Sequence, residues 1–115
     1  MKKLSFIACA LCCLFLTSCM APTNLYTWYD YEESTYQYSK KHTDKLQERV
    51  LAQYKKMEKQ KGIRKVVPPG LNAEYGFMLC KLGKTEEGLS YLKKEIELYP
   101  ESSKYISRII KQLEK

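Results

Sequence analysis

Apolar residues at helical spacing are the feature that most constrains the fold of this chain. Within residues 43–61 an apolar residue recurs every three or four positions, at Leu46, Val50, Tyr54 and Met57. This spacing places the four side chains on one face of an amphipathic helix. The same kind of pattern continues after Pro69, and no stretch has the composition of a convincing strand. The sequence therefore predicts an all-α domain.

Capping and breaking residues predict where the helices begin and end. Thr43 can cap a helix that runs to about residue 61, and Gly62 is a good stop signal. Pro69 can sit in the first turn of the next helix, which Gly83 ends. Two more helices follow, over about 85–99 and from about 102 onward. A short helix over 29–40 is expected as well, giving four to five helices in all. The apolar faces after residue 69 carry Leu71, Tyr75, Met78, Leu79 and Leu82, then Leu89, Leu92, Ile96 and Tyr99, and finally Tyr105, Ile106, Ile109, Ile110 and Leu113.

The first 18 residues resemble a bacterial lipoprotein signal peptide. Two lysines precede an apolar run over residues 4–16, which is too short to span a membrane as a stable helix. Leu16-Thr17-Ser18-Cys19 then matches a lipobox. The resemblance implies cleavage before Cys19, followed by a covalent diacylglycerol and an N-acyl chain such as palmitate on that residue. An ordinary secretory signal with a chance cysteine is the alternative.

Cleavage would leave a short tether over residues 19–25 and a single all-α domain over residues 26–115. A domain of this size can bury only a modest core. The three signal cysteines leave with the signal and Cys19 takes the lipid, so Cys80 alone remains as a free thiol. It can form no disulfide within the monomer. We expect it to be a buried small apolar residue.

Positive charge is concentrated in one segment. Residues 40–65 hold ten basic and three acidic residues, whereas residues 19–39 hold three acidic residues and no basic one. Export argues against nucleic acid as the partner. Lipid headgroups, cell-wall polymers or an acidic protein surface are then the anionic candidates. Lys55, Lys56 and Lys59 are the candidate contacts, although a solvated helix face that keeps a small protein soluble is the favoured explanation.

Aromatic residues crowd the segment from residue 26 to residue 38. Their spacing mixes helical and alternating periods. The rings could form a sugar-stacking platform, or they could pack on a neighbouring helix with their hydroxyls toward water, and packing is the favoured interpretation. The candidate partner-binding residues in this segment are Trp28, Tyr29, Tyr31 and Tyr36.

Catalytic chemistry is not indicated. His42 is the only histidine, and one histidine with one free thiol does not make a metal site. Adjacent glutamates, as at 32–33 and 86–87, diverge by about 100° on a helix and are poorly placed for paired acid–base work. No phosphate-binding loop or nucleophile motif is present. We therefore expect a protein that is not an enzyme, with no catalytic residue, no metal, no cofactor besides the lipid and no small-molecule substrate.

Residues 69–102 resemble a single tetratricopeptide repeat. Gly76 and Gly88 occupy the small positions where the two helices meet, and Pro100 follows the second helix. Asn72 and Glu95 depart from the family pattern. The resemblance implies a right-handed array of helical hairpins. Because one repeat cannot bury its faces alone, the helix over 43–61 and the last helix would cover its two sides.

The whole chain is similar to a family of small bacterial lipoproteins known only as a domain of unknown function. The features that carry this resemblance are the lipobox, Leu25-Tyr26-Thr27-Trp28, Val67-Pro68-Pro69-Gly70-Leu71, Ala73-Glu74-Tyr75-Gly76 and Tyr99-Pro100-Glu101-Ser102. Such proteins tend to be encoded beside a lipoprotein similar to the curli secretion channel, which implies a shared envelope assembly.

Two functions are expected from these features together. The first is a scaffold or adaptor for an envelope protein, lipid-anchored in the outer membrane of a Gram-negative cell and facing the periplasm, because Met20 rather than aspartate follows Cys19. The alternative is a cell-wall or glycan-binding lipoprotein that uses the aromatic residues of 28–38 and the basic helix.

Overall fold

A computed structural model describes residues 2–8 and 24–115 of the chain. All regular secondary structure in these two stretches is helical, so the prediction of an all-α fold is confirmed. Residues 2–8 are helical and exposed. Five α-helices follow residue 24, as expected. They are α2 (Tyr31–Lys40), α3 (Asp44–Met57), α4 (Leu71–Lys81), α5 (Thr85–Leu98) and α6 (Ser103–Leu113), with a 3-10 turn, η2 (Pro100–Ser102), before α6. Cys19 and most of the expected tether lie outside the described residues.

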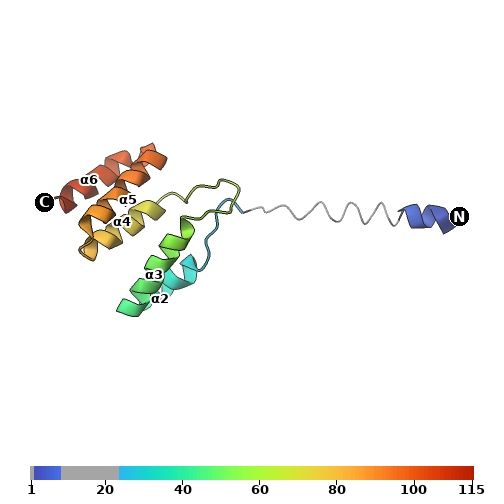
Figure 1. Cartoon of the computed structure of the whole chain (residues 1–115), viewed down its shortest axis with the longest axis horizontal. Helices are drawn as coiled ribbons and strands as arrows, with labels where there is room; N and C mark the ends of the chain where they lie inside the picture. Colours follow the sequence, from blue (N-terminus) through green and yellow to red (C-terminus); the bar gives the residue numbers. More distant parts are fainter. Residues whose placement is uncertain (1, 9–23) are drawn as a thin grey trace.

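The helices form two neighbouring groups. Figure 1 shows α2 beside α3 as one group, and α4, α5 and α6 side by side as the other. The helical hairpin that the sequence predicts over residues 69–102 is the α4–α5 pair. Gly83 lies just after α4 with φ +85°, a conformation that favours glycine, and so allows the tight turn into α5.

The two glycines of the hairpin bring its helices into backbone contact. A Cβ atom on Gly76 would lie 2.6 Å from the carbonyl oxygen of Gly88, and a Cβ atom on Gly88 would lie 2.5 Å from the carbonyl oxygen of Gly76. Both distances are too short for real atoms. The close approach expected at these residues is therefore confirmed.

The boundaries of α3 agree with the prediction at one end only. Thr43 caps the helix, because its Oγ1 accepts a hydrogen bond of 3.3 Å from the backbone N–H of Leu46. The C-terminal end at Met57 comes four residues before the predicted end, so the role given to Gly62 is wrong. Gly62 is instead buried against the backbone of Leu25, where it leaves no room for a side chain.

Two helix starts also differ from the prediction. α2 begins at Tyr31 rather than at Tyr29, because Tyr29 has a φ of +49° and cannot continue a right-handed helix. α4 begins at Leu71, so Pro69 precedes the helix. Gly70, at φ +92°, makes the turn between them.

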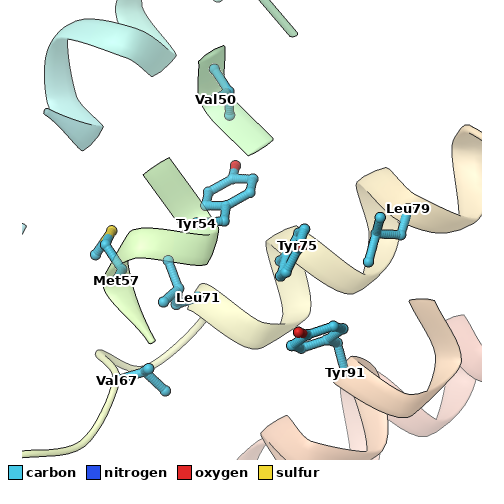
Figure 2. Close-up of a cluster of buried hydrophobic side chains, with 8 residues drawn as sticks. All are labelled: Val50, Tyr54, Met57, Val67, Leu71, Tyr75, Leu79 and Tyr91. Carbon is cyan, nitrogen blue, oxygen red and sulfur yellow. The ribbon is translucent and has the colours of Figure 1, made fainter. Parts of the chain in front are cut away.

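The core lies between α3 and α4, with one ring from α5 (Figure 2). Most of its side chains come from the predicted apolar faces and from the loop before α4, whereas Tyr91 of α5 was not on a predicted face. The core side chains are Val50, Tyr54, Met57, Val67, Leu71, Tyr75, Leu79 and Tyr91. Leu82 and Tyr105 were expected on these faces but are exposed. Leu82 lies just beyond the last turn of α4, and Tyr105 lies about 100° around α6 from the buried Ile106.

The two residues that depart from the tetratricopeptide pattern, Asn72 and Glu95, are both buried. Glu95 of α5 is buried, and its Oε1 accepts a hydrogen bond of 2.7 Å from the backbone N–H of Gly70. It therefore satisfies a donor at the start of α4. Asn72 is buried beside the same turn of α4. A small residue at position 95 would leave the Gly70 donor without this acceptor.

Cys80 is half-buried rather than fully buried. Its thiol donates a weak hydrogen bond to the carbonyl oxygen of Thr85, 3.7 Å away. Burial raises the pKa of the thiol, so the reactive thiolate is disfavoured. The sulfur occupies the space that a side chain at position 88 would need.

Candidate binding surface

Two segments far apart in the sequence are joined at the C-terminal end of α3. We call residues 24–29 and 59–66 together the clasp. The backbone N–H of Ile63 donates to the carbonyl of Asn24 at 3.0 Å, and that of Arg64 donates to the carbonyl of Leu25 at 3.3 Å. The part of the expected tether that the structure describes, residues 24–25, is thus held on the domain.

Side chains complete the clasp. Gln60 accepts a hydrogen bond of 2.8 Å from the backbone N–H of Thr27 and donates one of 3.0 Å to the carbonyl of the same residue. The hydroxyl of Thr27 accepts from the N–H of Lys61 at 3.0 Å. Tyr29 donates its hydroxyl to the carbonyl of Lys59 at 2.7 Å. These bonds use the residues that the sequence assigned to the end of α3, which is why that helix stops early.

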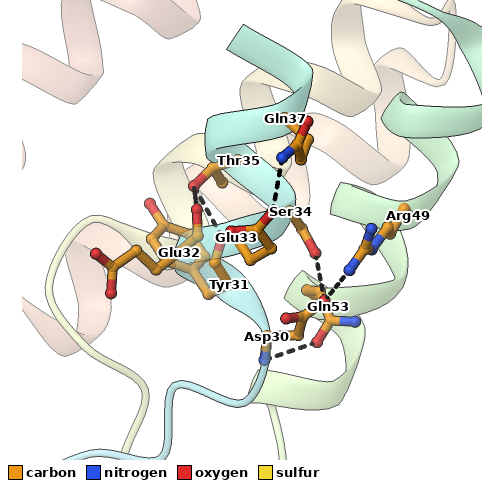
Figure 3. A network of polar contacts seen from close by, with 9 residues as sticks. All are labelled: Asp30, Tyr31, Glu32, Glu33, Ser34, Thr35, Gln37, Arg49 and Gln53. Carbon is orange, nitrogen blue, oxygen red and sulfur yellow. Dashed lines mark hydrogen bonds and ion pairs between the residues drawn. The ribbon is translucent and has the colours of Figure 1, made fainter. Parts of the chain in front are cut away.

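A carboxylate fixes the start of α2 on α3 (Figure 3). Asp30 Oδ2 accepts hydrogen bonds from Ser34 Oγ at 3.1 Å and from Arg49 Nη2 at 2.6 Å. The backbone N–H of Asp30 donates to Gln53 Oε1 at 3.3 Å. The Arg49 guanidinium, helped by the Ser34 hydroxyl, holds the pKa of Asp30 below its ordinary value. The aromatic segment is therefore positioned by polar contacts to α3.

Aromatic rings run in one continuous series from the clasp into the core. Their order is Tyr26, Trp28, Tyr31, Tyr54, Tyr75 and Tyr91, with neighbouring ring centroids 4.5 to 6.1 Å apart. Tyr31 thus packs between Trp28 and Tyr54, as the packing interpretation expected. Its hydroxyl donates to Glu74 of α4 at 2.7 Å. Burial and then this carboxylate raise the pKa of Tyr31, so the phenol stays protonated.

The other candidate aromatics stay at the surface and line two open hollows. Trp28 and Tyr29 share a hollow of about 440 Å³ with Lys61 and Asn24. Tyr29 and Tyr36 line a second hollow of about 510 Å³, together with the acidic side chains of Asp30, Glu32 and Glu33. The Lys40 ammonium lies 4.3 Å from the centre of the Tyr36 ring. Exposed rings of this kind can stack on a sugar or enter a lipid interface.

The candidate lysines differ in their surroundings. The Lys55 ammonium lies 3.2 Å from Glu58 Oε2 and 3.2 Å from the hydroxyl of Tyr91, which itself donates to Glu58 Oε1 at 2.5 Å. The hydrogen bond to Tyr91 and the bond and charge of Glu58 raise the pKa of Lys55. All three lysines are exposed, but Lys55 also joins α3 to α5.

A further groove lies between α3 and α4 and extends from Tyr54 to the α2–α3 turn and the end of α4. It encloses about 280 Å³ and is lined by Tyr38, His42, Gln47, Tyr54, Glu74, Phe77, Met78 and Lys81. Phe77 is partly exposed there, with the Lys81 ammonium 4.8 Å from its ring centre. The sequence analysis named no site here. One sequence feature could have indicated this groove: Phe77 is an apolar residue on the opposite side of α4 from the buried Tyr75.

The described residues offer groups for noncovalent binding, namely aromatic faces, ammonium groups and carboxylates. Within residues 2–8 and 24–115, no three or more histidine, cysteine or acidic side chains gather as they would around a metal ion. Over the same residues, no helix has the length and apolar character needed to cross a membrane.

Comparison with known families yields one match. A family profile described as "Domain of unknown function (DUF4810)" matches residues 25–109, which extend from the clasp into α6. No curated protein and no solved structure matches the chain.

Proposed function

We propose that this chain, which belongs to the DUF4810 family of domains of unknown function, is a lipid-anchored periplasmic scaffold that holds an envelope protein at the outer membrane. The observation that carries the proposal is the placement of the clasp and the groove along α3. The clasp begins five residues after Cys19 in the sequence, whereas the groove extends along α3 from Tyr54 to Gln47 and the α2–α3 turn, away from the clasp. Gln47 lies ten residues before Met57, the last residue of α3, which corresponds to a rise of about 15 Å.

The anchor rests on the sequence at the N-terminus. Leu16-Thr17-Ser18-Cys19 follows a short apolar run behind two lysines, and Cys19 would carry the diacylglycerol and the N-acyl chain. Several acyl chains on one residue give stable membrane attachment, which a single chain does not. Met20 supports the outer membrane and the periplasmic face as the destination.

The groove supports the scaffold role. Its lining combines the apolar side chains of Phe77 and Met78 with the polar side chains of His42, Glu74 and Lys81. An apolar side chain of a partner, ringed by polar contacts, fits such a place. The backbone approach at Gly76 and Gly88 supports a tetratricopeptide-like hairpin over residues 69–102, a fold unit suited to holding proteins. The family resemblance nominates a lipoprotein similar to the curli secretion channel as the partner.

Capture of that channel-like lipoprotein in detergent tests the proposal. The lipidated chain and the candidate are co-expressed and purified through a tag on the chain. We expect Phe77→Ala to reduce the captured amount by about thirty-fold, as the loss of a central interface contact of about 2 kcal/mol requires.

Tyr105→Ala is the matched control for this capture, because it removes an aromatic ring from the exposed face of α6, away from the groove. Capture should be unchanged by this variant. Equal capture by both variants would exclude the groove as the partner site. No capture by the unmodified chain would exclude this partner altogether.

A second candidate function rests on the hollow beside Trp28 and Tyr29. Two exposed rings next to the polar groups of Asn24 and Lys61 match the requirements for stacking and hydrogen bonding to a sugar. A glycan-binding lipoprotein should be retained on purified peptidoglycan, and Trp28→Ala should abolish the retention while Tyr105→Ala keeps it. Passage of the unmodified chain through the peptidoglycan without delay would eliminate this candidate.

A further inference from the structure

The clasp exposes large apolar side chains on both of its segments. Leu25 is 50% exposed, Trp28 46% and Tyr29 42% on the first segment, and Ile63 is 58% and Val66 41% exposed on the second. The backbone hydrogen bonds from Ile63 and Arg64 to residues 24 and 25 hold the two segments together. These apolar side chains are therefore carried by one fixed structure at the edge of the domain where residue 24 enters (Figure 1).

The clasp is also strongly basic. Lys59, Lys61, Arg64 and Lys65 are exposed on its second segment, and neither segment contains an acidic residue. Lys61 lines the same hollow as Trp28 and Tyr29, so charge and aromatic rings meet there. Tryptophan and tyrosine gather at the headgroup level of bilayers, and lysine and arginine are attracted to anionic leaflets. The combination matches a surface that enters an anionic lipid interface.

The distance to Cys19 keeps this surface near a membrane. Asn24 lies five positions after Cys19, and a fully extended chain over that interval spans at most about 17 Å. If Cys19 carries the lipid, the clasp is the part of the domain whose position the anchor restricts most. Lys55 of α3 is already paired with Glu58 and Tyr91 at the surface. The basic second segment of the clasp, in contrast, is hydrogen-bonded through its backbone to residues 24 and 25, which are the described residues of the domain nearest Cys19 in the sequence.

We propose that the clasp is a second membrane contact, in which Trp28, Tyr29 and Ile63 enter the headgroup region of an anionic phospholipid leaflet while the basic side chains of residues 59–65 contact its phosphates. The proposal rests on the lipid anchor of the proposed function. It gives the domain one orientation. With the C-terminal end of α3 at the lipid, the part of the groove lined by His42 and Gln47 lies on the side of the domain away from the membrane.

Trp28 makes the contact measurable, because it is the only tryptophan of the chain. The lipidated mature protein is reconstituted into vesicles of phosphatidylethanolamine and phosphatidylglycerol with brominated acyl chains, and into vesicles of brominated phosphatidylcholine. We expect the anionic vesicles to quench Trp28 emission to about half or less, since an interfacial ring lies close to the bromines. The neutral vesicles should quench it clearly less.

Two triple variants with the same loss of charge separate the clasp from the rest of the surface. Lys59→Gln, Lys61→Gln and Lys65→Gln together should restore most of the Trp28 emission in anionic vesicles. Lys41→Gln, Lys45→Gln and Lys104→Gln together remove exposed lysines from outside the clasp and should leave the quenching unchanged. Equal far-ultraviolet circular dichroism of the variants establishes that each is folded.

Flotation of the vesicles tests attachment through the lipid anchor separately from membrane contact by the clasp. A protein that floats with anionic vesicles while its Trp28 stays unquenched overturns the membrane contact and leaves the anchor standing. If neutral vesicles quench Trp28 as much as anionic vesicles do, or if the clasp variant is quenched as much as the unmodified protein, the clasp does not recognise an anionic lipid surface. Protection of Trp28 by peptidoglycan fragments but not by vesicles assigns the surface to a glycan instead.

If Cys19 proves to carry no lipid, the unlipidated mature chain is mixed with the same brominated anionic vesicles at low salt. If these vesicles quench Trp28 and salt reverses the quenching, the clasp contacts the membrane without the anchor. If they do not quench Trp28, the membrane contact is overturned as well.

Discussion

Single polar side chains hold helices together across the boundary between the two groups. Glu74 of α4 accepts hydrogen bonds from Tyr31 of α2 at 2.7 Å and from Tyr54 of α3 at 3.1 Å, both at Oε2. Lys55 and Tyr91 link α3 to α5 in a similar way. Hydrogen bonds to charged groups are stronger than those between neutral groups. A few residues therefore set how the first two helices sit on α4 and α5.

Asp30 makes stability depend on pH. Its pKa lies below the ordinary value of 3.8 because the folded state favours the carboxylate through Arg49 and Ser34. The stability it contributes is present above that ordinary value and is lost as the pH falls through the lowered one. Asp30→Asn should therefore lower the melting temperature near pH 7 and have little effect near pH 2. Thermal melts of both proteins across this range check the result.

Glu33→Gln is the control for this pH effect, because Glu33 accepts a hydrogen bond only from Gln37, within its own helix. We expect a small change at either pH. If Asp30→Asn destabilises equally near neutral and acidic pH, the ion pair with Arg49 is not the source of its effect.

Backbone contact between helices dominates at the scale of the elements. α4 and α5 meet at Gly76 and Gly88 without intervening side chains, and Glu95 of α5 accepts from the backbone at the start of α4. The α3–α4 contact is built differently, from large side chains that include Tyr54 and Tyr75. The hairpin should therefore be more sensitive to added volume than the tyrosine-rich contact, where side chains can shift.

Alanine at either hairpin glycine should destabilise the domain. Helix propensity alone favours alanine over glycine by about 1 kcal/mol. The new Cβ, however, would lie 2.5 to 2.6 Å from a backbone carbonyl oxygen of the partner helix, so the helices must move apart. We expect Gly76→Ala and Gly88→Ala each to reduce the free energy of unfolding by about 1–3 kcal/mol, and leucine to reduce it further. Urea denaturation measures the change.

Lys93→Ala provides the comparison on α5, since this residue is exposed and its truncation adds no volume to the contact. Its free energy of unfolding should stay within about 0.5 kcal/mol of the unmodified protein. If Gly76→Ala and Gly88→Ala change the free energy of unfolding as little as Lys93→Ala does, the two helices can separate at no cost.

The molecule as a whole has two functional ends under the proposals above. The clasp begins five positions after the expected lipid site in the sequence, and the groove with Phe77 extends along α3 away from the clasp. A partner held in the groove would then be kept at a set distance from the outer membrane. The series of packed aromatic rings and the shared carboxylate of Glu74 connect the clasp to α4, which carries Phe77.

The lipid site gives a prediction for the intact protein in a Gram-negative host. Cys19→Ser should abolish labelling by radioactive palmitate and cause the uncleaved precursor to accumulate, because the thiol that accepts diacylglycerol is lost. The unmodified chain should fractionate with the outer membrane and resist protease added to intact cells. Mass spectrometry that finds an unlipidated N-terminus downstream of Cys19 would refute the anchor, and recovery in the inner membrane would refute the destination.

Local chemistry determined much of this fold from the sequence alone. Apolar spacing determined the helical class, Thr43 determined where α3 begins, and Gly83 determined the turn after α4. These features depend on residues within a few positions of one another, whose preferences act whatever surrounds them. The contact of Gly76 with Gly88 was also predicted, from the resemblance of residues 69–102 to a tetratricopeptide repeat.

Only the tertiary structure decided where α3 ends and what its last residues do. Gln60 leaves the helical path because Thr27, 33 positions earlier, offers it two backbone partners. Lys55 is engaged because Tyr91, 36 positions later, lies beside it. The groove at Phe77 likewise needs α4 to lie against the α2–α3 turn. Such pairings follow from how whole helices pack, and no local pattern encodes them, because each residue's own neighbours leave its distant partner undetermined.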